Sequence, residues 1–271
     1  MVDSDTLYGE LWADEASGLE AELCQSLTPR DQDCLYTTFA TFAPQPGQVV
    51  LDIGCRDATH AIELHRRFGV NVLALDPVPL HIGRARAKID AAGLAAAITP
   101  VIGGIEALPE RITSIDHIWC RDVLNHVALA EGLAECARVP RPGGKMLVYQ
   151  TFATDELAPA EAARLYAALA IVPTNIDPLF FTATARVAGL RVLLTDPIDS
   201  EWREGWLEAS GDRAQEMLED LLWVARIRRR EAELIERYGP ARVEALRGGC
   251  LWGIYQLLGK LRPTIYVLGR N

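Results

Sequence analysis

The feature that most constrains the fold is a short apolar run that ends in an acidic residue and a glycine. Residues 49–53 read VVLDI and are followed directly by Gly54. A run of this length and composition predicts a buried parallel strand that enters a turn. A helix is predicted over residues 58–68, and a second strand over 70–75 leads to Asp76. This strand–helix–strand order predicts a βαβ unit with both strand ends at one edge of a sheet.

The same alternation continues along the chain. Further strands are predicted over 98–102, 116–120, 146–149, 191–194 and 263–268, and further helices over 80–92, 129–138 and 177–188. Residues 201–258 are predicted to be largely helical, with Met217, Leu221, Val224 and Ile227 on one apolar face. We therefore predict an α/β fold with a Rossmann-like, seven-stranded, mostly parallel sheet. The C-terminal strand is expected to be antiparallel and at the edge of that sheet.

The predicted organisation is one structural domain in three parts. Residues 1–46 would form an N-terminal helical lid, residues 47–200 and 260–271 the core, and residues 201–259 a helical insertion. Several large aromatic residues fall in the insertion, at Trp202, Trp206, Trp223, Trp252 and Tyr255. Aromatic residues at helical spacing usually belong to a core, so most of these are expected to pack the insertion. One or two would line a pocket for a flat or cationic molecule.

Charge and composition exclude several classes of function. The net charge is −10, from 37 acidic and 27 basic residues, which disfavours binding to nucleic acid or to an anionic membrane. No apolar run approaches the about 20 residues of a membrane span. The six cysteines show no CxxC spacing, and the five histidines show no metal-binding spacing. We expect a cytoplasmic protein without a metal, in which His60, His65, His81 and His117 lie at the surface or on helix faces.

Two acidic residues and one glycine indicate a nucleoside site. Gly54 allows close approach of a ligand to the turn, and Asp76 follows about twenty residues later, where an acidic side chain binds ribose hydroxyls. The alternative is an ordinary βαβ unit with two capping aspartates. A dinucleotide site would need GxGxxG, and two of those three glycines are missing after residue 53.

Five segments in order resemble the motifs of class I S-adenosylmethionine-dependent methyltransferases. They are VVLDIGCRDATHA, VLALDPVPLHIGRARAKIDAAGL, IGGIEALPE, SIDHIWCRDVLNHV and RVPRPGGKMLVYQTF. The ordered match spans residues 48–194 and the final strand. Within the family, this region is most similar to small-molecule enzymes such as the quinone, tocopherol, sarcosine and phosphoethanolamine methyltransferases. The resemblance implies S-adenosylmethionine as cofactor and S-adenosylhomocysteine as product.

The resemblance also implies a set of cofactor residues, namely Asp52, Gly54, Asp76, Pro77, Ile105, Glu106 and Arg121. The first two would serve the methionine end of the cofactor, and Asp76 and Pro77 the ribose and the adenine. The residues at 105 and 106 would frame the adenine ring. The backbone carbonyl near Arg121 would accept a hydrogen bond from the methionine ammonium group.

Three positions depart from the family pattern. Arg56 and Ala58 stand where the second and third glycines of the first motif are usual, and Gly104 stands where an aspartate often binds the adenine amine. Arg56 would place a bulky cation near the methionine of the cofactor or near an acid of the acceptor. Asp57 would either pair with Arg56 or itself hydrogen-bond the amine of the cofactor. These changes would either weaken cofactor binding or mark a different use of the fold.

Methyl transfer needs mainly alignment of the acceptor, because the sulfonium is already activated. If the acceptor must lose a proton, His126 is the candidate base, since histidine ordinarily titrates near neutral pH. Asp122 and Asn125 would orient it or the substrate. The alternative for His126 is a structural role in its loop. Acceptor contacts are expected from Tyr8 and Trp12 in the lid and from Tyr149 and Gln150 after the fifth strand.

The sequence supports three functional hypotheses. The first is methyl transfer from S-adenosylmethionine to an N, O or C atom of a small metabolite. The second is a non-methylating step on the same fold, a cyclisation or isomerisation that uses Arg56 and Asp57. The third is a catalytically silent partner subunit whose helical insertion is a docking surface. The oligomeric state stays open, with a homodimer among the options.

Overall fold

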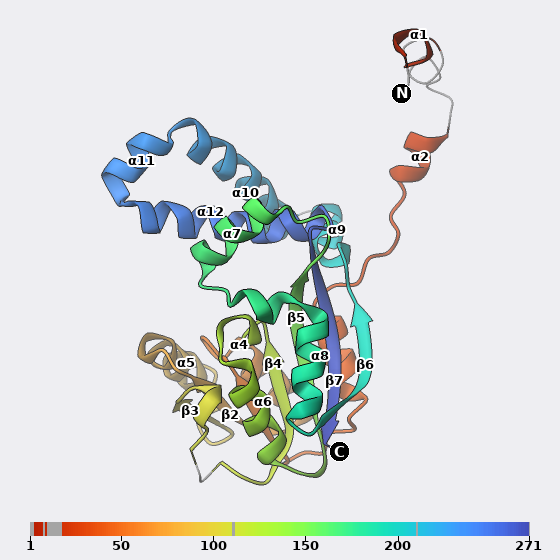
Figure 1. Cartoon of the computed structure of the whole chain (residues 1–271). Coiled ribbons are helices and arrows are strands. Elements are labelled where there is room, and N and C mark those ends of the chain that lie inside the picture. The colour runs from red at the N-terminus through yellow and green to blue at the C-terminus, as the bar shows by residue number, and fades with distance from the viewer. Residues whose placement is uncertain (1–2, 8, 10–17, 110–111, 210, 271) are drawn as a thin grey trace.

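A seven-stranded sheet with the order β3-β2-β1-β4-β5-β7-β6 organises the chain (Figure 1). The computed structural model describes residues 3–7, 9, 18–109, 112–209 and 211–270. The strands are β1 (Val49–Ile53), β2 (Asn71–Asp76), β3 (Ile98–Ile102), β4 (Ile115–Arg121), β5 (Pro140–Ala153), β6 (Leu190–Pro197) and β7 (Leu261–Arg270). The predicted strands are therefore confirmed, with β5 longer than predicted because it also includes the proline–glycine segment.

The position of β7 corrects the sequence-based prediction. This strand is antiparallel, as predicted, but it lies between β5 and β6, and β6 forms the edge. The reason is visible in the burial of β7, whose residues 263–269 are all buried. An apolar strand of this kind gains from neighbours on both sides, whereas the exposed pattern of β6 suits an edge.

Helices cover both faces of the sheet and its upper end. The α-helices are α1 (Ser4–Thr6), α2 (Leu19–Leu23), α3 (Asp33–Ala40), α4 (Thr59–Phe68), α5 (Pro79–Ala91), α6 (Leu129–Arg138), α7 (Pro159–Leu169), α8 (Pro178–Val187), α9 (Glu201–Glu208), α10 (Asp212–Arg229), α11 (Glu231–Tyr238) and α12 (Pro240–Leu257). Short 3-10 turns are η2 (Ile105–Ala107), η3 (Leu124–His126) and η4 (Pro173–Ile176). The sequence analysis did not predict α7, although Pro159 at its first turn is a common helix start.

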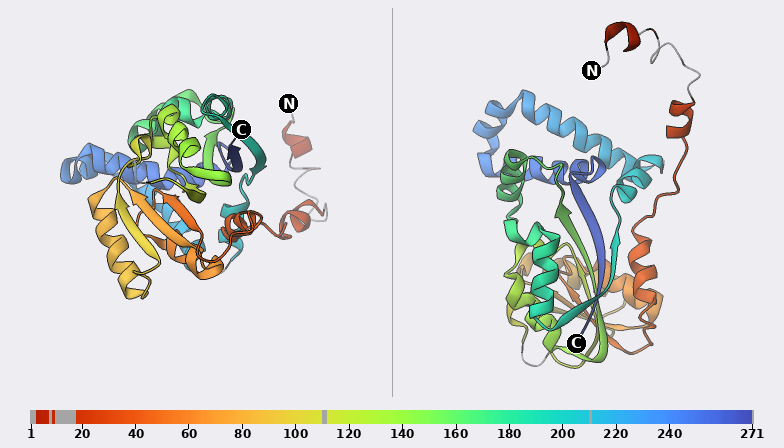
Figure 2. Two further views of the ribbon diagram at one scale, coloured as in Figure 1. Left: turned by 90° about the horizontal axis from the view of Figure 1, so that it is seen from below. Right: turned by 45° about the vertical axis from the view of Figure 1, so that its right-hand side comes forward.

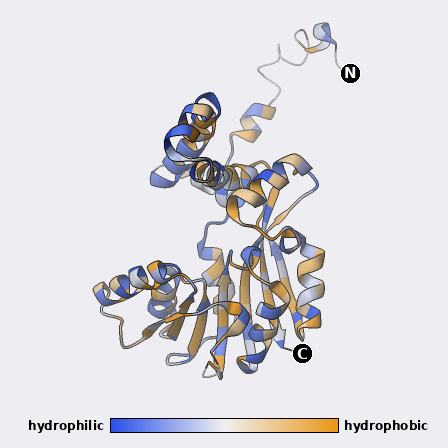
Figure 3. Ribbon diagram, turned by 60° about the vertical axis from the view of Figure 1, so that its left-hand side comes forward, coloured by the Kyte–Doolittle hydropathy of each residue, from blue (hydrophilic) through white to orange (hydrophobic). Residues whose placement is uncertain are grey.

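Two apolar layers hold the sheet. One lies between the sheet and α3, α4 and α5, and the other between the sheet and α6 and α8. Figure 3 shows the apolar strands in the middle and the polar outer helices around them. Helix α3 belongs to the first layer, because Leu35 and Phe39 are fully buried there. Of the predicted N-terminal lid, residues 33–40 thus form part of the sheet's covering layer.

None of the described residues before α3 is buried. Helix α2 has no buried residue. Arg30, before α3, forms ion pairs of 2.7 Å with Asp196 at the end of β6 and with Glu201 of α9. Tyr8 and Trp12, the two predicted lid contacts, lie outside the described residues. Closure of the crevice by residues 1–32 stays a prediction.

The helical insertion forms a cap above the carboxyl ends of the parallel strands (Figures 1 and 2). A third apolar cluster joins α7 and α12 to the start of β7. Met217 and Ile227 of the predicted apolar face of α10 are buried, but Leu221 is 44% exposed. Among the described residues, no helix combines the length and the apolar character that a membrane crossing needs.

Candidate cofactor and acceptor site

The turn after β1 has the left-handed backbone that glycines favour, although non-glycine residues occupy two of the positions where the family usually has glycine. Gly54, Arg56 and Ala58 all have positive φ angles, of 74°, 51° and 62°. A left-handed conformation costs a residue with a Cβ about 1–2 kcal/mol, which glycine avoids. Replacing the usual glycines by Arg56 and Ala58 therefore adds side chains and backbone strain to the turn. The left-handed backbone conformation of the turn is kept.

Gly54 is required for a second reason. A Cβ built at this position would lie 2.2 Å from Cγ2 of Val123, in the loop after β4. The backbone N–H groups of Gly54 and Cys55 both donate to the carbonyl of Leu75, at 2.8 and 2.9 Å. The turn is thus clamped between the ends of β2 and β4, at the carboxyl edge of the sheet.

Asp52 places an unpaired carboxylate oxygen beside this turn. The residue is 2% exposed, and its Oδ2 atom has no hydrogen-bond partner. Burial, and then the charge of Asp76, raise the pKa of Asp52 to about 7, against a hydrogen bond from the backbone N–H of Ala61. A buried, unsatisfied carboxylate is unfavourable without a partner, so this oxygen suits a cationic ligand group.

Asp76 lies at the end of β2 and links three segments. Its Oδ2 accepts from the backbone N–H of Arg56 at 3.0 Å, and its Oδ1 accepts from the N–H of Val78 at 2.9 Å. Nδ1 of His81 lies 3.0 Å from the same Oδ1. Each carboxylate oxygen has further acceptor capacity, so ribose hydroxyls can add to these bonds. The structure brings Asp52, Gly54 and Asp76 together at one edge of the sheet, as predicted.

The predicted pair of Arg56 and Asp57 is not present. Asp57 instead accepts from Oγ1 of Thr59 at 2.7 Å and pairs with Nζ of Lys88 at 2.8 Å. Partial burial opposes ionisation, but the bonds from Lys88 and Thr59 lower the pKa of Asp57 to about 2. The left-handed turn directs Asp57 to helices α4 and α5, and Arg56 is exposed. A role of Asp57 toward a cofactor amine stays a prediction.

The adenine residues predicted after β2 and β3 have different surroundings. Pro77 is exposed at the start of the loop before α5. Ile105 is 3% exposed, and a Cβ on Gly132 of α6 would lie 3.3 Å from its Cγ2. Its side chain is therefore already packed in the core, and its backbone is the part left for a ligand. Glu106 is exposed, and its Oε1 accepts from the N–H of Ala128 at 3.3 Å.

His60, which the sequence analysis expected at the surface or on a helix face, lies on α4 and contacts Arg121 at the end of β4. It is half-buried in the first turn of α4, with Nδ1 2.7 Å from the Tyr36 hydroxyl and Nε2 2.5 Å from Nη1 of Arg121. Burial, and then the charge of Arg121, lower the pKa of His60 to about 3. The ring is therefore neutral at physiological pH, and Nε2 accepts from the guanidinium. Only its position two residues after Ala58 pointed to this role.

Arg121, at the end of β4, lies beside a buried aromatic pair. Its guanidinium carbon is 5.6 Å from the ring centroids of both Tyr149 and Trp202. These two rings stack 4.5 Å apart at 6°. Tyr149, which was predicted to contact the acceptor, is only 2% exposed. Its side chain is therefore packed inside the protein and offers little surface to a ligand. Arg203, the next residue on α9, donates from Nε to Oε1 of Gln256 at 2.9 Å.

The predicted catalytic residues are not in contact with each other. Asp122 has φ 53° and accepts from Oγ1 of Thr151 at 3.1 Å, and burial raises its pKa. His126 is exposed, and its Nδ1 lies 3.1 Å from the carbonyl of Ala170. This hydrogen bond links the loop after β4 to the end of α7, as expected if His126 has a structural role. Its role as a base stays a prediction.

Gln150 is fully buried in an amide network that supports the same loop. Its Nε2 bonds to Oδ1 of Asn125 and to the carbonyl of Asn175. Nδ2 of Asn175 donates to the carbonyls of Leu124 and Val127, at 2.7 and 2.8 Å. The structure therefore uses Gln150 inside the protein and does not bring it to the crevice.

A comparison with protein families decides the class of the region just described. Residues 50–144 match a family model described as a methyltransferase domain. These residues are similar to that family, and they are called the methyltransferase domain below after its model. This domain contains the β1 turn, Asp76, η2, Arg121 and His126, and it therefore includes every predicted cofactor residue. The sequence-based resemblance is confirmed for this part of the chain.

Curated relatives agree over the methyltransferase domain. A ubiquinone biosynthesis O-methyltransferase of Methylocella silvestris is 36% identical over 108 residues, which are 39% of this chain and 41% of that protein. The chain spans less than half the length of the first curated relatives that it matches, 30% for a sterol 24-C-methyltransferase and 41% for the ubiquinone enzyme.

Solved structures resemble the chain beyond the methyltransferase domain. A geranyl diphosphate C-methyltransferase from Streptomyces coelicolor, in complex with geranyl diphosphate and S-adenosylhomocysteine, has a TM-score of 0.64 at 12% identity and covers 89% of this chain and 79% of its own. The [4+2]-cyclase SpnF has a TM-score of 0.64 at 17% identity, with 87% and 79% covered. The chain thus shares the Rossmann-like fold of these solved structures.

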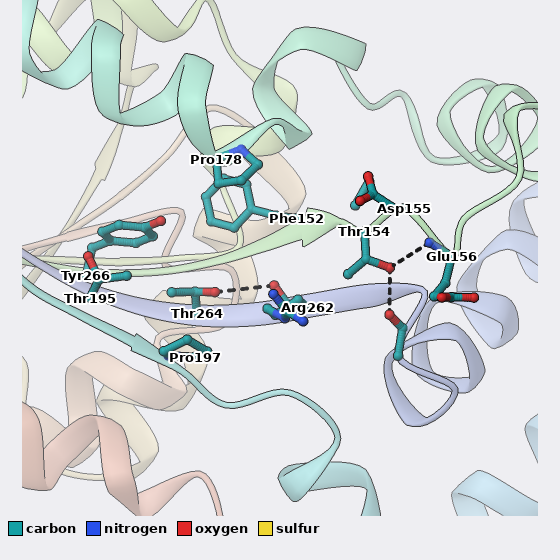
Figure 4. Close-up of a pocket in the computed structure, with 12 residues that line it drawn as sticks. Phe152, Thr154, Asp155, Glu156, Pro178, Thr195, Pro197, Arg262, Thr264 and Tyr266 are labelled. Atoms are coloured by element: carbon teal, nitrogen blue, oxygen red, sulfur yellow. Dashed lines mark hydrogen bonds between the residues drawn. The ribbon is translucent and has the colours of Figure 1, made fainter.

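A separate pocket lies away from the cofactor turn of the methyltransferase domain. It has a volume of about 490 Å³ and lies over the ends of β5, β7 and β6 near the start of α8 (Figure 4). Phe152 and Tyr266 line it, together with Thr154, whose hydroxyl donates to the carbonyl of Gly259 at 2.7 Å. None of the predicted site residues lines this pocket. In the part of the chain that the structure describes, no cluster of three His, Cys, Asp or Glu residues could hold a metal ion.

Proposed function

We propose that the protein transfers a methyl group from S-adenosylmethionine to a small metabolite. The observation that carries the proposal is the buried Asp52, whose Oδ2 has no partner beside the left-handed turn. An amino-acid ammonium group would satisfy that oxygen, and Asp76, at the end of the neighbouring strand, would take ribose hydroxyls. The methyltransferase domain and its relatives support this assignment.

The cofactor would supply an activated sulfonium methyl group, so the protein has little covalent chemistry to perform. The chain's residues would bind and align. Asp52 would hold the ammonium end, the turn at Gly54 would leave room for the close approach, and Asp76 would fix the ribose. The cap and the Tyr149–Trp202 pair would exclude water from the acceptor side. If the acceptor loses a proton, His126 is the proposed base.

The acceptor is proposed to be a small molecule, modified at an N, O or C atom. Support comes from the relatives, which are named for ubiquinone biosynthesis, sterols and geranyl diphosphate. SpnF shows that a cyclase can have this fold, so cyclisation is the second candidate. All six cysteines are free thiols, which supports the proposal of a reducing, cytoplasmic location.

Calorimetric titration with S-adenosylmethionine and S-adenosylhomocysteine tests the cofactor assignment. We expect both to bind the wild type and neither to bind Asp76→Ala, which should stay folded but lose thermal stability, because the N–H groups of Arg56 and Val78 lose their acceptor. Asp90→Ala, an exposed carboxylate on α5, is the matched control and should bind normally. Failure of the wild type to bind either molecule would contradict the proposal. Binding without transfer of labelled methyl groups to any acceptor in a metabolite panel would favour the cyclase alternative.

A further inference from the structure

Two arginines on the acceptor side of the site have no acidic partner. Four arginines of the described chain are at least half-buried, namely Arg30, Arg121, Arg203 and Arg247. Arg30 and Arg247 form ion pairs with carboxylates. For Arg121 and Arg203, the described residues provide no carboxylate oxygen within 4.0 Å, and their hydrogen bonds go to neutral His60 and Gln256.

These two arginines lie against aromatic rings, Arg121 beside the Tyr149–Trp202 pair and Arg203 with its guanidinium carbon 4.2 Å from the ring centroid of Trp206. Arg121 ends β4 beside the rings of Tyr149 and Trp202, and Arg203 directly follows Trp202 on α9. Burial lowers the pKa of Arg203, whereas Tyr149, Asp122 and Asp220 raise it. The positive charge of Arg121 lowers it by a smaller effect, so the two guanidinium groups share one region. Asp122 and Asp220 are the nearby acidic groups. Asp122 bonds to Thr151, and neither carboxylate forms an ion pair with Arg121 or Arg203.

Two partly desolvated guanidinium groups without an ion pair, hydrogen-bonded only to neutral side chains, are stabilised when a further anion binds to them. Guanidinium groups bind carboxylate and phosphate groups with paired hydrogen bonds. We propose that Arg121 and Arg203 form an anion-binding subsite, and that the acceptor therefore carries a carboxylate or a phosphate group. The inference rests on the proposed function, because Arg121 also ends the strand that borders the cofactor turn.

His60 has a positioning role in this subsite. As a neutral acceptor bonded to Tyr36, it holds one edge of the Arg121 guanidinium without neutralising its charge. A carboxylate at that position would have satisfied the arginine and removed its affinity for a ligand. The same argument applies to Gln256, which is fully buried and holds Arg203 through a neutral amide.

Titration with two anions tests the subsite. Inorganic phosphate and benzoate are added separately to the full chain, with and without saturating S-adenosylhomocysteine, at constant ionic strength. We expect at least one of them to bind the wild type, with affinity reduced at least about tenfold in Arg203→Met and in Arg121→Met. The anion that binds more tightly assigns the acceptor group. Arg186→Gln, an exposed arginine on α8, should bind like the wild type.

Two further measurements separate the outcomes. Arg203→Lys keeps the charge and should lose less affinity than Arg203→Met, whereas a merely structural arginine would change thermal stability and leave anion binding unaltered. If the wild type binds S-adenosylhomocysteine but neither anion, or if Arg203→Met binds both anions as the wild type does, the subsite is wrong. If anions bind in an Arg203-dependent way while S-adenosylhomocysteine does not bind, the subsite stands and the proposed function fails.

Discussion

Asp52 shows how one buried side chain connects folding with ligand binding. Its carboxyl is removed from water and lies near Asp76, and both effects favour the protonated form. The folded pKa of about 7 is above the ordinary aspartate value of 3.8, so the folded state binds more protons between these pH values. The stabilisation from this group is therefore fully present at low pH and declines as pH rises toward 7.

Cofactor binding should show the opposite pH trend. A methionine ammonium group is attracted to the ionised form of Asp52, so the affinity for S-adenosylhomocysteine should rise between pH 6 and pH 8. The expected change approaches about tenfold, which corresponds to about 1.4 kcal/mol. Calorimetry in buffers of different ionisation enthalpy should also detect proton release on binding.

Asp52→Asn is the control for this pH dependence. It keeps the shape of the side chain and removes the titration, so its affinity should be weaker and independent of pH over the same range. Its unfolding free energy at pH 8 should equal or exceed that of the wild type, because a buried charge has been removed. An unchanged pH profile in Asp52→Asn would show that another group titrates.

In the turn after β1, backbone conformation and packing act together. Gly54→Ala should lower the free energy of unfolding by about 3–5 kcal/mol, from the left-handed backbone and from overlap with Val123. Gly93, with φ 69° and open space around it, is the matched position, and Gly93→Ala should lower the same quantity by about 1 kcal/mol.

A double mutant separates the two contributions. Val123→Ala removes the overlapping methyl group, so its combination with Gly54→Ala should be less destabilising than the sum of the single changes, by about 1–3 kcal/mol. Urea unfolding of the four proteins measures this coupling. Simple additivity would mean that the turn and the loop after β4 relax independently.

The loop that carries His126 depends on Asn175 of η4. Asn175 is 1% exposed and donates to two carbonyls of the η3 loop. Asn175→Ala leaves these carbonyls unsatisfied and should lower the unfolding free energy by about 2–4 kcal/mol. Asn71→Ala, an exposed asparagine at the start of β2, should change it by less than about 0.5 kcal/mol. Equal effects of the two substitutions, measured by thermal unfolding, would contradict this role.

For the molecule as a whole, the cap and the cofactor site use separate interactions. Arg247 of α12 is buried and pairs with Glu231 of α11 at 2.7 Å, and Arg164 of α7 pairs with the same carboxylate at 3.0 Å. Residues of the cofactor site lie within 50–144, outside this network. Loosening the cap should therefore affect acceptor binding more than cofactor binding.

Arg247→Met tests this separation. We expect it to lower the unfolding free energy by about 2 kcal/mol while the affinity for S-adenosylhomocysteine stays within about twofold. Arg213→Met removes an exposed ion pair with Glu216 on α10 and should change stability by less than about 0.5 kcal/mol. A large loss of cofactor affinity in Arg247→Met would show that cap and site are coupled.

The sequence alone determined the βαβ alternation, the order of the strands along the chain and the common sheet edge of the residues predicted to bind the cofactor. These depend on short-range patterns, and parallel strands place Asp52, Gly54 and Asp76 at one edge without further information. Only the tertiary structure decided that β7 lies inside the sheet, that Asp57 pairs with Lys88 and that His60 holds Arg121. It also decided that Gln150 is internal and that Arg203 lies near Arg121. Each of these depends on contacts between segments far apart in the chain, whose energies no local pattern of residues records.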